Sequence, residues 1–337
     1  MRHRDLKRSS ASSPLATPNV LTIAAAAIAA AAGAALLNNW LARKAERRNP
    51  PRGRFIKVHG VRLHYVERGT GPALVLLHGN GSMIEDFQSS GLIELAAKKY
   101  RVIAFDRPGF GHSDRPRHIT WTPEAQADLI AAALEKIEVP SAIVLGHSWG
   151  TLVALALGMN YPRQVQALVL ASGYYYPTAR VDVVILSPPA IPIIGALLGH
   201  TISPLMSRVM WPLLLKKIFG PAPVPKKFAG FPQEMAVRPS QIRASAAESA
   251  LMIPSAGRLQ NEYSQLRMPV AIVAGAQDRL IESEQAVRLN GDIPQSSLRC
   301  VPGAGHMVHQ TATAEIMSAI ELVTDQTNRL ALVPSAA

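Results

Sequence analysis

The sequence is poor in cysteine, with Cys300 the single one among 337 residues. An internal disulfide is therefore excluded, and the chain is compatible with an oxidising or a reducing compartment. Cys300 stands in the apolar run SLRCV, so we expect it in the core.

Complete nucleotide-binding patterns are also missing. The stretch HGNG at residues 78–81 has two closely spaced glycines, but neither GKS nor GKT follows it. No third glycine arrives to complete G-x-G-x-x-G either. The P-loop needs the first of these patterns and the dinucleotide-binding loop needs the second, so nucleotide binding is disfavoured.

Acidic residues are few, with 23 Asp and Glu against 35 Lys and Arg, giving a formal net charge of +12. The excess is local, because residues 1–54 hold ten Lys or Arg against Asp5 and Glu46, a net charge of +8. The remaining charge is ordinary for a domain of this size. The distribution therefore argues against a nucleic-acid-binding face.

Within that basic segment, residues 21–37 read LTIAAAAIAAAAGAALL, where Thr22 is the only polar side chain. As a helix this run would extend about 26 Å, slightly less than the roughly 30 Å of a bilayer core. We predict an N-terminal membrane anchor, as in a bacterial inner-membrane protein. A cleaved signal peptide, which would make the protein secreted, is the alternative. A soluble helix is disfavoured because the run has no polar face. The basic residues after the run weakly favour a cytoplasmic folded part.

Apolar runs and helical patterns alternate from Phe55 onward, which predicts an α/β fold with a mostly parallel sheet covered on both faces. FIKVHG and VRLHYVERG form a predicted hairpin at residues 55–69. Helical patterns cover residues 84–98, 122–137 and 151–159. Further predicted strands cover residues 73–79, 101–106, 142–146, 167–172, 270–275 and 297–302.

The alternation stops over residues 174–255, a proline-rich stretch in which we expect several short helices. We interpret it as a cap inserted into a core made of residues 55–173 and 256–325. Residues 1–54 then form the anchor and a charged linker, and residues 326–337 a C-terminal tail.

The pattern G-x-S-x-G occurs at residues 146–150, where a buried strand is followed by a helix. Such a turn presents Ser148 above the sheet edge, and glycines at both flanks avoid collisions with the neighbouring strand and helix. Ser148 is the candidate nucleophile.

A serine needs an imidazole to take its proton and a carboxylate to orient that imidazole. Asp278 follows the predicted strand at residues 270–275, and His306 follows the next strand. The order Ser, Asp, His and the position of each at a strand end make Asp278 and His306 the candidate partners. His309 is the second-choice base.

Other carboxylates fit less well. Glu282 and Glu284 look like residues at the start of a helix, and Asp106 precedes the nucleophile, which favours a role in stabilising its loop.

An oxyanion formed by attack on a carbonyl needs main-chain N–H donors. We expect one from Trp149, directly after the nucleophile, and one from Asn80, with Gly81 as the alternative.

Five motifs in order resemble those of the α/β-hydrolase superfamily, in the branch of epoxide hydrolases, proline iminopeptidases and serine esterases. They are HGNG (78–81), DRPGFGHS (106–113), GHSWG (146–150), GAQD (275–278) and GAGH (303–306). The resemblance implies an eight-stranded sheet, with the inserted segment as cap domain. Epoxide hydrolases carry aspartate where this chain has Ser148, which disfavours epoxide opening.

These observations predict a serine hydrolase that cleaves a carboxylic ester of a hydrophobic small molecule or lipid and needs neither metal nor organic cofactor. An aminopeptidase or a C–C bond hydrolase with the same triad is an alternative. For the aminopeptidase, Glu234 and Glu248 are the cap carboxylates available to receive an amine. A non-catalytic binding protein is the alternative of another class.

Overall fold

The structure is a computed structural model that describes residues 19–179, 190 and 194–332. The predicted basic residues before the anchor and part of the predicted cap lie outside the described residues. The strands are β1 Arg54–Val58, β2 Val61–Arg68, β3 Ala73–Leu77, β4 Arg101–Phe105, β5 Ala142–His147, β6 Val165–Ala171, β7 Val270–Gly275 and β8 Ser296–Val301. The main helices are α1 Val20–Arg48, α2 Ile84–Ser90, α3 Leu92–Ala96, α4 Pro123–Lys136, α5 Trp149–Asn160, α7 Ile194–His200, α8 Ile202–Phe219, α9 Gln233–Ala236, α10 Pro239–Leu259, α11 Glu284–Asp292, α12 Val308–Thr311 and α13 Thr313–Leu332, with 3-10 helices η2 Lys226–Gly230 and η3 Gln260–Gln265.

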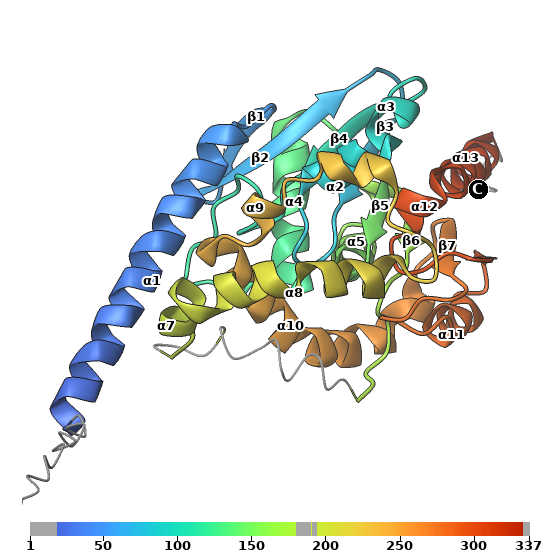
Figure 1. The fold of residues 1–337 in the computed structure, drawn as a ribbon. Coiled ribbons are helices and arrows are strands. Elements are labelled where there is room, and N and C mark those ends of the chain that lie inside the picture. Colours follow the sequence, from blue (N-terminus) through green and yellow to red (C-terminus); the bar gives the residue numbers. More distant parts are fainter. Residues whose placement is uncertain (1–18, 180–189, 191–193, 333–337) are drawn as a thin grey trace, which may run out of the picture.

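The eight strands form one sheet in the order β1-β2-β4-β3-β5-β6-β7-β8. Figure 1 shows this sheet together with the helices around it. β1 and β2 pair antiparallel, β2 also pairs antiparallel with β4, and every other neighbouring pair is parallel. The central strands β5 and β7 are buried along their whole length, as expected of parallel strands covered on both sides. The predicted α/β-hydrolase architecture is confirmed.

Helices cover both faces of the sheet. One apolar cluster joins the sheet to α4, α5 and α11, and a second joins the other face to α2, α3 and α13. The predicted α4 is present with Thr122 as its N-cap and Pro123 in its first turn. The helix predicted over residues 84–98 is two helices, because Gly91 adopts a left-handed conformation that ends α2.

Cys300 is exposed, which corrects the expected core position. β8 is an edge strand of the sheet, and its residues are only partly covered. An apolar run on an edge strand does not guarantee burial.

The described part of the inserted segment is dominated by two long helices, so the prediction of only short helices was wrong. α8 has 18 residues with Pro212 inside it, and α10 has 21 with Pro254 inside it. Pro239 opens α10, where a missing N–H costs nothing. Tertiary packing offsets the hydrogen bonds that the interior prolines remove.

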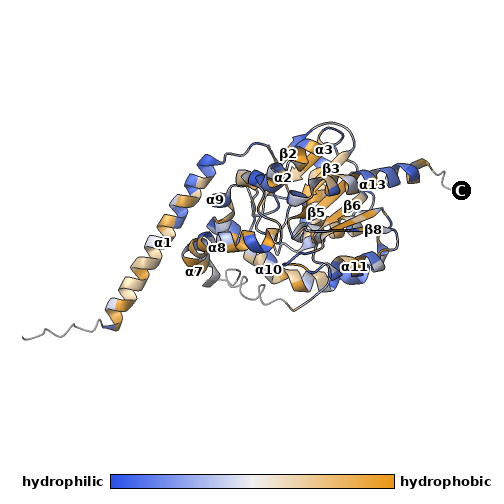
Figure 2. Ribbon diagram, turned by 45° about the vertical axis from the view of Figure 1, so that its right-hand side comes forward, coloured by the Kyte–Doolittle hydropathy of each residue, from blue (hydrophilic) through white to orange (hydrophobic). Residues whose placement is uncertain are grey.

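α1 continues as one helix to Arg48, so the first half of the charged linker expected at residues 43–54 is helical. It is the one described helix long and apolar enough to cross a membrane. Figure 2 shows its first part in hydrophobic colours and its end in hydrophilic ones. The apolar part is exposed, whereas the later part contacts α7, α8, α9 and α10.

Two buried residues hold α1 to the inserted segment. Asn38 donates hydrogen bonds to the carbonyl oxygens of His200 (3.0 Å) and Thr201 (2.7 Å) and accepts one from Arg208 (3.1 Å). Ala45 packs in a small apolar cluster that also includes Phe219.

At the other end of the chain, α13 runs to Leu332. The helical core therefore continues past residue 325, where we expected a tail to begin. The α13 residues before the tail pack on the sheet, and α13 contacts β6 and β7.

Candidate active site

Ser148 lies at the turn between β5 and α5 with a positive φ of 52° and ψ of −122°. A β-carbon on Gly146 would lie 2.4 Å from the carbonyl oxygen of Gly150, and one on Gly150 would lie 2.2 Å from that of Leu77. Both distances are shorter than a carbon and an oxygen can approach. The two glycines therefore let β5 turn sharply into α5 and leave Ser148 at the sheet edge.

The structure brings Ser148, Asp278 and His306 together. The His306 Nε2 atom lies 3.0 Å from Ser148 Oγ, and His306 Nδ1 lies 2.8 Å from Asp278 Oδ2. The His306 side chain is 4% exposed and that of Asp278 is 2% exposed. Water competes little for these contacts.

The carboxylate of Asp278 is held from its own loop. Its Oδ1 atom accepts hydrogen bonds from the main-chain N–H groups of Leu280 (2.8 Å) and Ile281 (3.0 Å), which leaves Oδ2 for His306. With a proton on Nδ1 facing Asp278, His306 presents an unprotonated Nε2 to the hydroxyl of Ser148. This arrangement is suited to removing a proton from Ser148.

The predicted oxyanion donors lie beside the nucleophile. Trp149 is the first residue of α5, where a main-chain N–H has no partner within the helix. A β-carbon on Gly79 would lie 3.1 Å from the Ser148 β-carbon, so the loop that carries Asn80 passes next to Ser148. Within the described residues, the main-chain N–H groups of Trp149 and Asn80 donate no hydrogen bond.

Arg107 holds the loop that carries Asn80, a role that was not predicted from the sequence. Its guanidinium donates to the carbonyl oxygens of His78 (2.7 Å) and Gly79 (2.9 Å), and it forms an ion pair with Glu248 of α10. Both charged side chains are 0% exposed. The only signals in the sequence were an arginine inside DRPGFG and a lone glutamate in ASAAESA.

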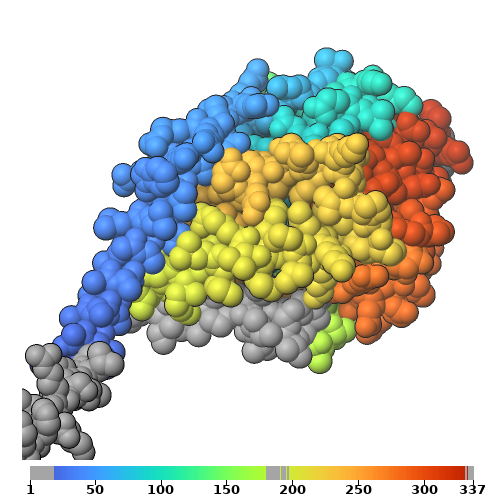
Figure 3. Space-filling model, in the orientation of Figure 1, coloured from blue at the N-terminus to red at the C-terminus, as the bar shows by residue number. Residues whose placement is uncertain are grey.

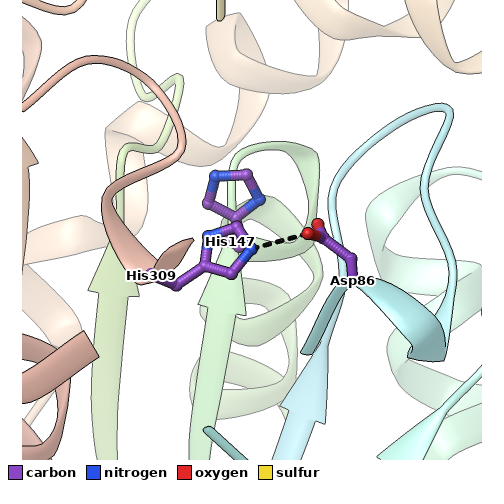
Figure 4. Close-up of side chains that lie close together, drawn as sticks. All are labelled: Asp86, His147 and His309. Carbon is purple, nitrogen blue, oxygen red and sulfur yellow. Dashed lines mark ion pairs between the residues drawn. The ribbon is translucent and has the colours of Figure 1, made fainter. Parts of the chain in front are cut away.

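A second buried cluster lies behind the nucleophile and consists of Asp86, His147 and His309 (Figure 4). His309 Nε2 lies 3.0 Å from Asp86 Oδ1, and the His147 and His309 ring centroids are 4.2 Å apart. His147 Nε2 donates to the carbonyl oxygen of His306 at 3.1 Å. Burial and the neighbouring His309 and His306 hold the pKa of His147 well below its usual value, so it stays neutral.

Among the described residues, Asp86, His147 and His309 form a group that could hold a metal ion, because their ligand atoms lie within 4.8 Å of one another. Two donors on one zinc ion lie at most about 4.2 Å apart, so the side chains would have to close around it. The contact with the His306 carbonyl instead shows what His147 does without an ion, which is to hold the loop that carries His306.

The competing residues fall elsewhere. His309 faces Asp86 rather than Ser148, Glu284 begins α11, and Glu282 precedes the N-cap of that helix. Asp106 is 0% exposed and accepts hydrogen bonds from His64 Nδ1 (2.7 Å) and from the main-chain N–H of Ile84 (3.0 Å). Its expected role as a loop carboxylate agrees with these contacts.

A surface cleft of about 580 Å³ opens near the site, where α8 ends. Pro212, Leu215 and Arg279 are among the residues that line it, and Arg279 directly follows Asp278. Ser148, Asp278 and His306 are not among the residues that line this cleft.

Comparison with known proteins identifies the family of the chain. A profile of the alpha/beta hydrolase family matches residues 74–319. A protein of Mycobacterium tuberculosis described as uncharacterized is 27% identical over 296 residues, which is 82% of each chain. The 2-hydroxymuconate semialdehyde hydrolase of Pseudomonas sp. (strain CF600) is 34% identical over 137 residues, 40% of this chain and 48% of that one.

Among solved structures, a membrane phospholipase A described as a bacterial virulence factor has a TM-score of 0.65 at 20% identity and covers 92% of this chain and 97% of its own. A thermophilic esterase from Thermogutta terrifontis has a TM-score of 0.66 at 20% identity, covering 82% of this chain and 99% of its own. At such identities the likeness shows the fold, and the profile match shows the family. The motifs predicted that family from the sequence, and the chain belongs to the alpha/beta hydrolase family.

Proposed function

We propose that this protein is a serine hydrolase that cleaves a carboxylic ester of a hydrophobic small molecule or lipid through an acyl-enzyme. The observation that carries the proposal is the unbroken chain of contacts from Ser148 Oγ to His306 (3.0 Å) and from His306 to Asp278 (2.8 Å). Membership of a hydrolase family and the esterase among its structural neighbours support it.

In the proposed mechanism, Ser148 Oγ attacks the ester carbonyl while His306 Nε2 takes its proton. Asp278 holds the imidazole in the required tautomer and stabilises the imidazolium. The N–H groups of Trp149 and Asn80 receive the oxyanion. The protonated His306 then delivers its proton to the departing alcohol, and the same steps with water release the acid.

Membrane association through the N-terminal helix is part of the proposal. We propose that the chain consists of an anchor within residues 1–54, a two-part hydrolase core and a cap within residues 174–255. The apolar, exposed first part of α1 supports the anchor, as does the structural likeness to a membrane phospholipase A. An anchored enzyme with an apolar cap is suited to substrates that partition into the bilayer.

The test is to replace Ser148 with Ala in the full chain and measure hydrolysis of short nitrophenyl esters and labelling by a fluorophosphonate. Both should be lost, because Ser148 Oγ is the hydroxyl that His306 Nε2 contacts. Ser172→Ala is the matched control, since Ser172 is buried, has a positive φ of 47° and follows the neighbouring strand β6. Turnover by Ser148→Ala equal to that of the control would refute the mechanism, and an unlabelled wild type would instead favour a non-catalytic binder.

A C–C bond hydrolase remains the second candidate, because a relative that is 34% identical over 137 residues is described as a 2-hydroxymuconate semialdehyde hydrolase. A chromogenic vinylogous diketone offered beside the esters would separate the two, and faster turnover of the diketone would favour this candidate. The aminopeptidase alternative is weakened, because the carboxylate of Glu248 is engaged by Arg107.

A further inference from the structure

The cap helix α8 carries an apolar stripe on its outside. Its exposed large apolar residues recur every three or four positions, the spacing of one helix face. We call this set the outer stripe; it consists of Ile202, Leu205, Met206, Val209, Met210, Leu213 and Leu214. Val209 is 71% exposed and Leu213 is 59% exposed. Single exposed apolar residues are common on protein surfaces, but a contiguous set marks an interaction site.

The opposite face of α8 is apolar as well and is already used. Phe219 is buried, and Trp211, Leu215 and Ile218 pack against the same small cluster. A helix that is apolar all round is normally enclosed by protein or by lipid. Protein encloses one side of α8, and no described residue covers the other.

The outer stripe begins where α1 meets the cap. Asn38, the first buried residue of α1, bonds the carbonyl oxygens of His200 and Thr201, and Thr201 directly precedes α8. The apolar residues of α1 that precede Asn38 project from the cap. From this junction α8, yellow in Figure 3, runs across the face of the molecule that the figure shows. A bilayer that holds the apolar part of α1 therefore has its surface near the start of α8.

The charge of α8 fits the same neighbour. The helix contains no acidic residue, and its last turn carries the exposed pair Lys216 and Lys217. An apolar face flanked by lysines is the pattern of a helix that lies in the interface of a membrane with anionic headgroups.

We propose that the outer stripe of α8 lies in the bilayer interface, so that the cap sits on the membrane and the enzyme takes its substrate from the lipid phase. The proposal rests on the proposed anchoring by α1 and on the proposed hydrolysis of hydrophobic esters. The partner is the headgroup region of an anionic bilayer. A second copy of the chain is the competing occupant, which the test must separate.

The first experiment measures depth in the membrane. The full chain with Cys300→Ser, which removes the one exposed thiol, receives a single cysteine at Val209 and a bimane label, and is reconstituted into vesicles of phosphatidylcholine and phosphatidylglycerol. Brominated lipids should quench this label, most strongly when the bromines are shallow, because an interfacial helix lies about 5–10 Å into the headgroup and acyl boundary.

Two further positions calibrate the measurement. A label at Ile28 of α1 should be quenched by deeply placed bromines, and a label at Val287 of α11, which is exposed to 54%, should not be quenched. Quenching at Val209 no greater than at Val287 would overturn the proposal. If the label at Val209 were not quenched and two unlabelled Val209→Cys chains formed a disulfide, the stripe would be assigned to a second copy and the proposal would be overturned. Absence of quenching at Ile28 would overturn the anchoring on which the proposal rests.

The second experiment separates docking from chemistry. The double variant Val209→Glu/Leu213→Glu should hydrolyse nitrophenyl acetate at the wild-type rate and a long-chain nitrophenyl ester embedded in vesicles about tenfold more slowly. Val287→Glu is the control and should match the wild type on both. If the double variant hydrolysed the embedded ester as fast as the wild type does, the proposal would be overturned. If the wild type hydrolysed neither ester, the proposed function would be overturned instead.

Discussion

The ion pair between Arg107 and Glu248 offers the sharpest test of how the proposed cap is joined to the proposed core. All five N–H donors of Arg107 are used: on His78, Gly79 and Gln126 and twice on the carboxylate of Glu248. In the variant Glu248→Gln the charge disappears. Because each carboxylate oxygen accepts from Arg107, the new –NH₂ group faces an arginine N–H whichever way the amide turns.

Breaking a buried ion pair by removing one partner costs about 3–5 kcal/mol, because the other charge stays buried without compensation. At about 2–4 °C per kcal/mol, Glu248→Gln should lower the Tm of the full chain in detergent by about 6–20 °C. The assay is thermal unfolding followed by near-ultraviolet circular dichroism. Catalytic turnover should fall as well, since Arg107 holds the loop that carries Asn80.

The matched control is Glu124→Gln, which breaks the ion pair with the 56% exposed Arg258 and should cost less than about 1 kcal/mol. The double variant Arg107→Met/Glu248→Met should be more stable than Glu248→Gln, because it leaves no unpaired charge. A Tm for Glu248→Gln no lower than that of Glu124→Gln would refute the reasoning.

Three further predictions concern the site and its surroundings. Asp278→Asn should lower kcat on nitrophenyl esters by about 10⁴-fold with the circular dichroism spectrum unchanged, because His306 then loses its tautomer, and a loss below tenfold would contradict the assignment. Gly150→Ala should prevent soluble expression, since its β-carbon would lie 2.2 Å from the Leu77 carbonyl oxygen, and a folded, labelled variant would count against the tight turn. Burial, with Asp106 nearby, raises the pKa of Glu85 from 4.5 to about 7, so the folded state keeps a proton that the unfolded chain releases. Wild-type stability should therefore fall relative to Glu85→Gln as pH rises from about 4.5 to 7, and a Tm difference that does not vary with pH would refute this.

Residues at strand ends could be placed from the sequence because their positions follow from local patterns. Ser148, Asp278 and His306 each come just after an apolar run that forms a parallel strand, and the carboxyl ends of such strands meet at one edge of the sheet. The spacing of apolar runs also located the strands themselves. Long-range packing was not needed for either inference.

Contacts between the proposed core and the proposed cap could not be predicted in this way. Arg107 and Glu248 are 141 positions apart, and nothing local to either residue indicates the other. The lengths of α8 and α10 were missed for a related reason. Proline content predicts short helices, but packing of an apolar face can hold a helix together across a missing hydrogen bond.

The contacts of α10 bear on how substrate reaches Ser148. Besides the ion pair of Glu248, α10 binds the side chain of Asn80 through the Ser245 carbonyl (3.1 Å) and the Ser249 hydroxyl (3.1 Å). Lifting α10 would therefore break a buried ion pair and displace the loop that carries a proposed oxyanion donor. An opening that costs this much and disables the site cannot be the normal route of entry. We therefore expect α10 to stay in place during turnover and substrate to enter by the cleft that Pro212, Leu215 and Arg279 line at the end of α8.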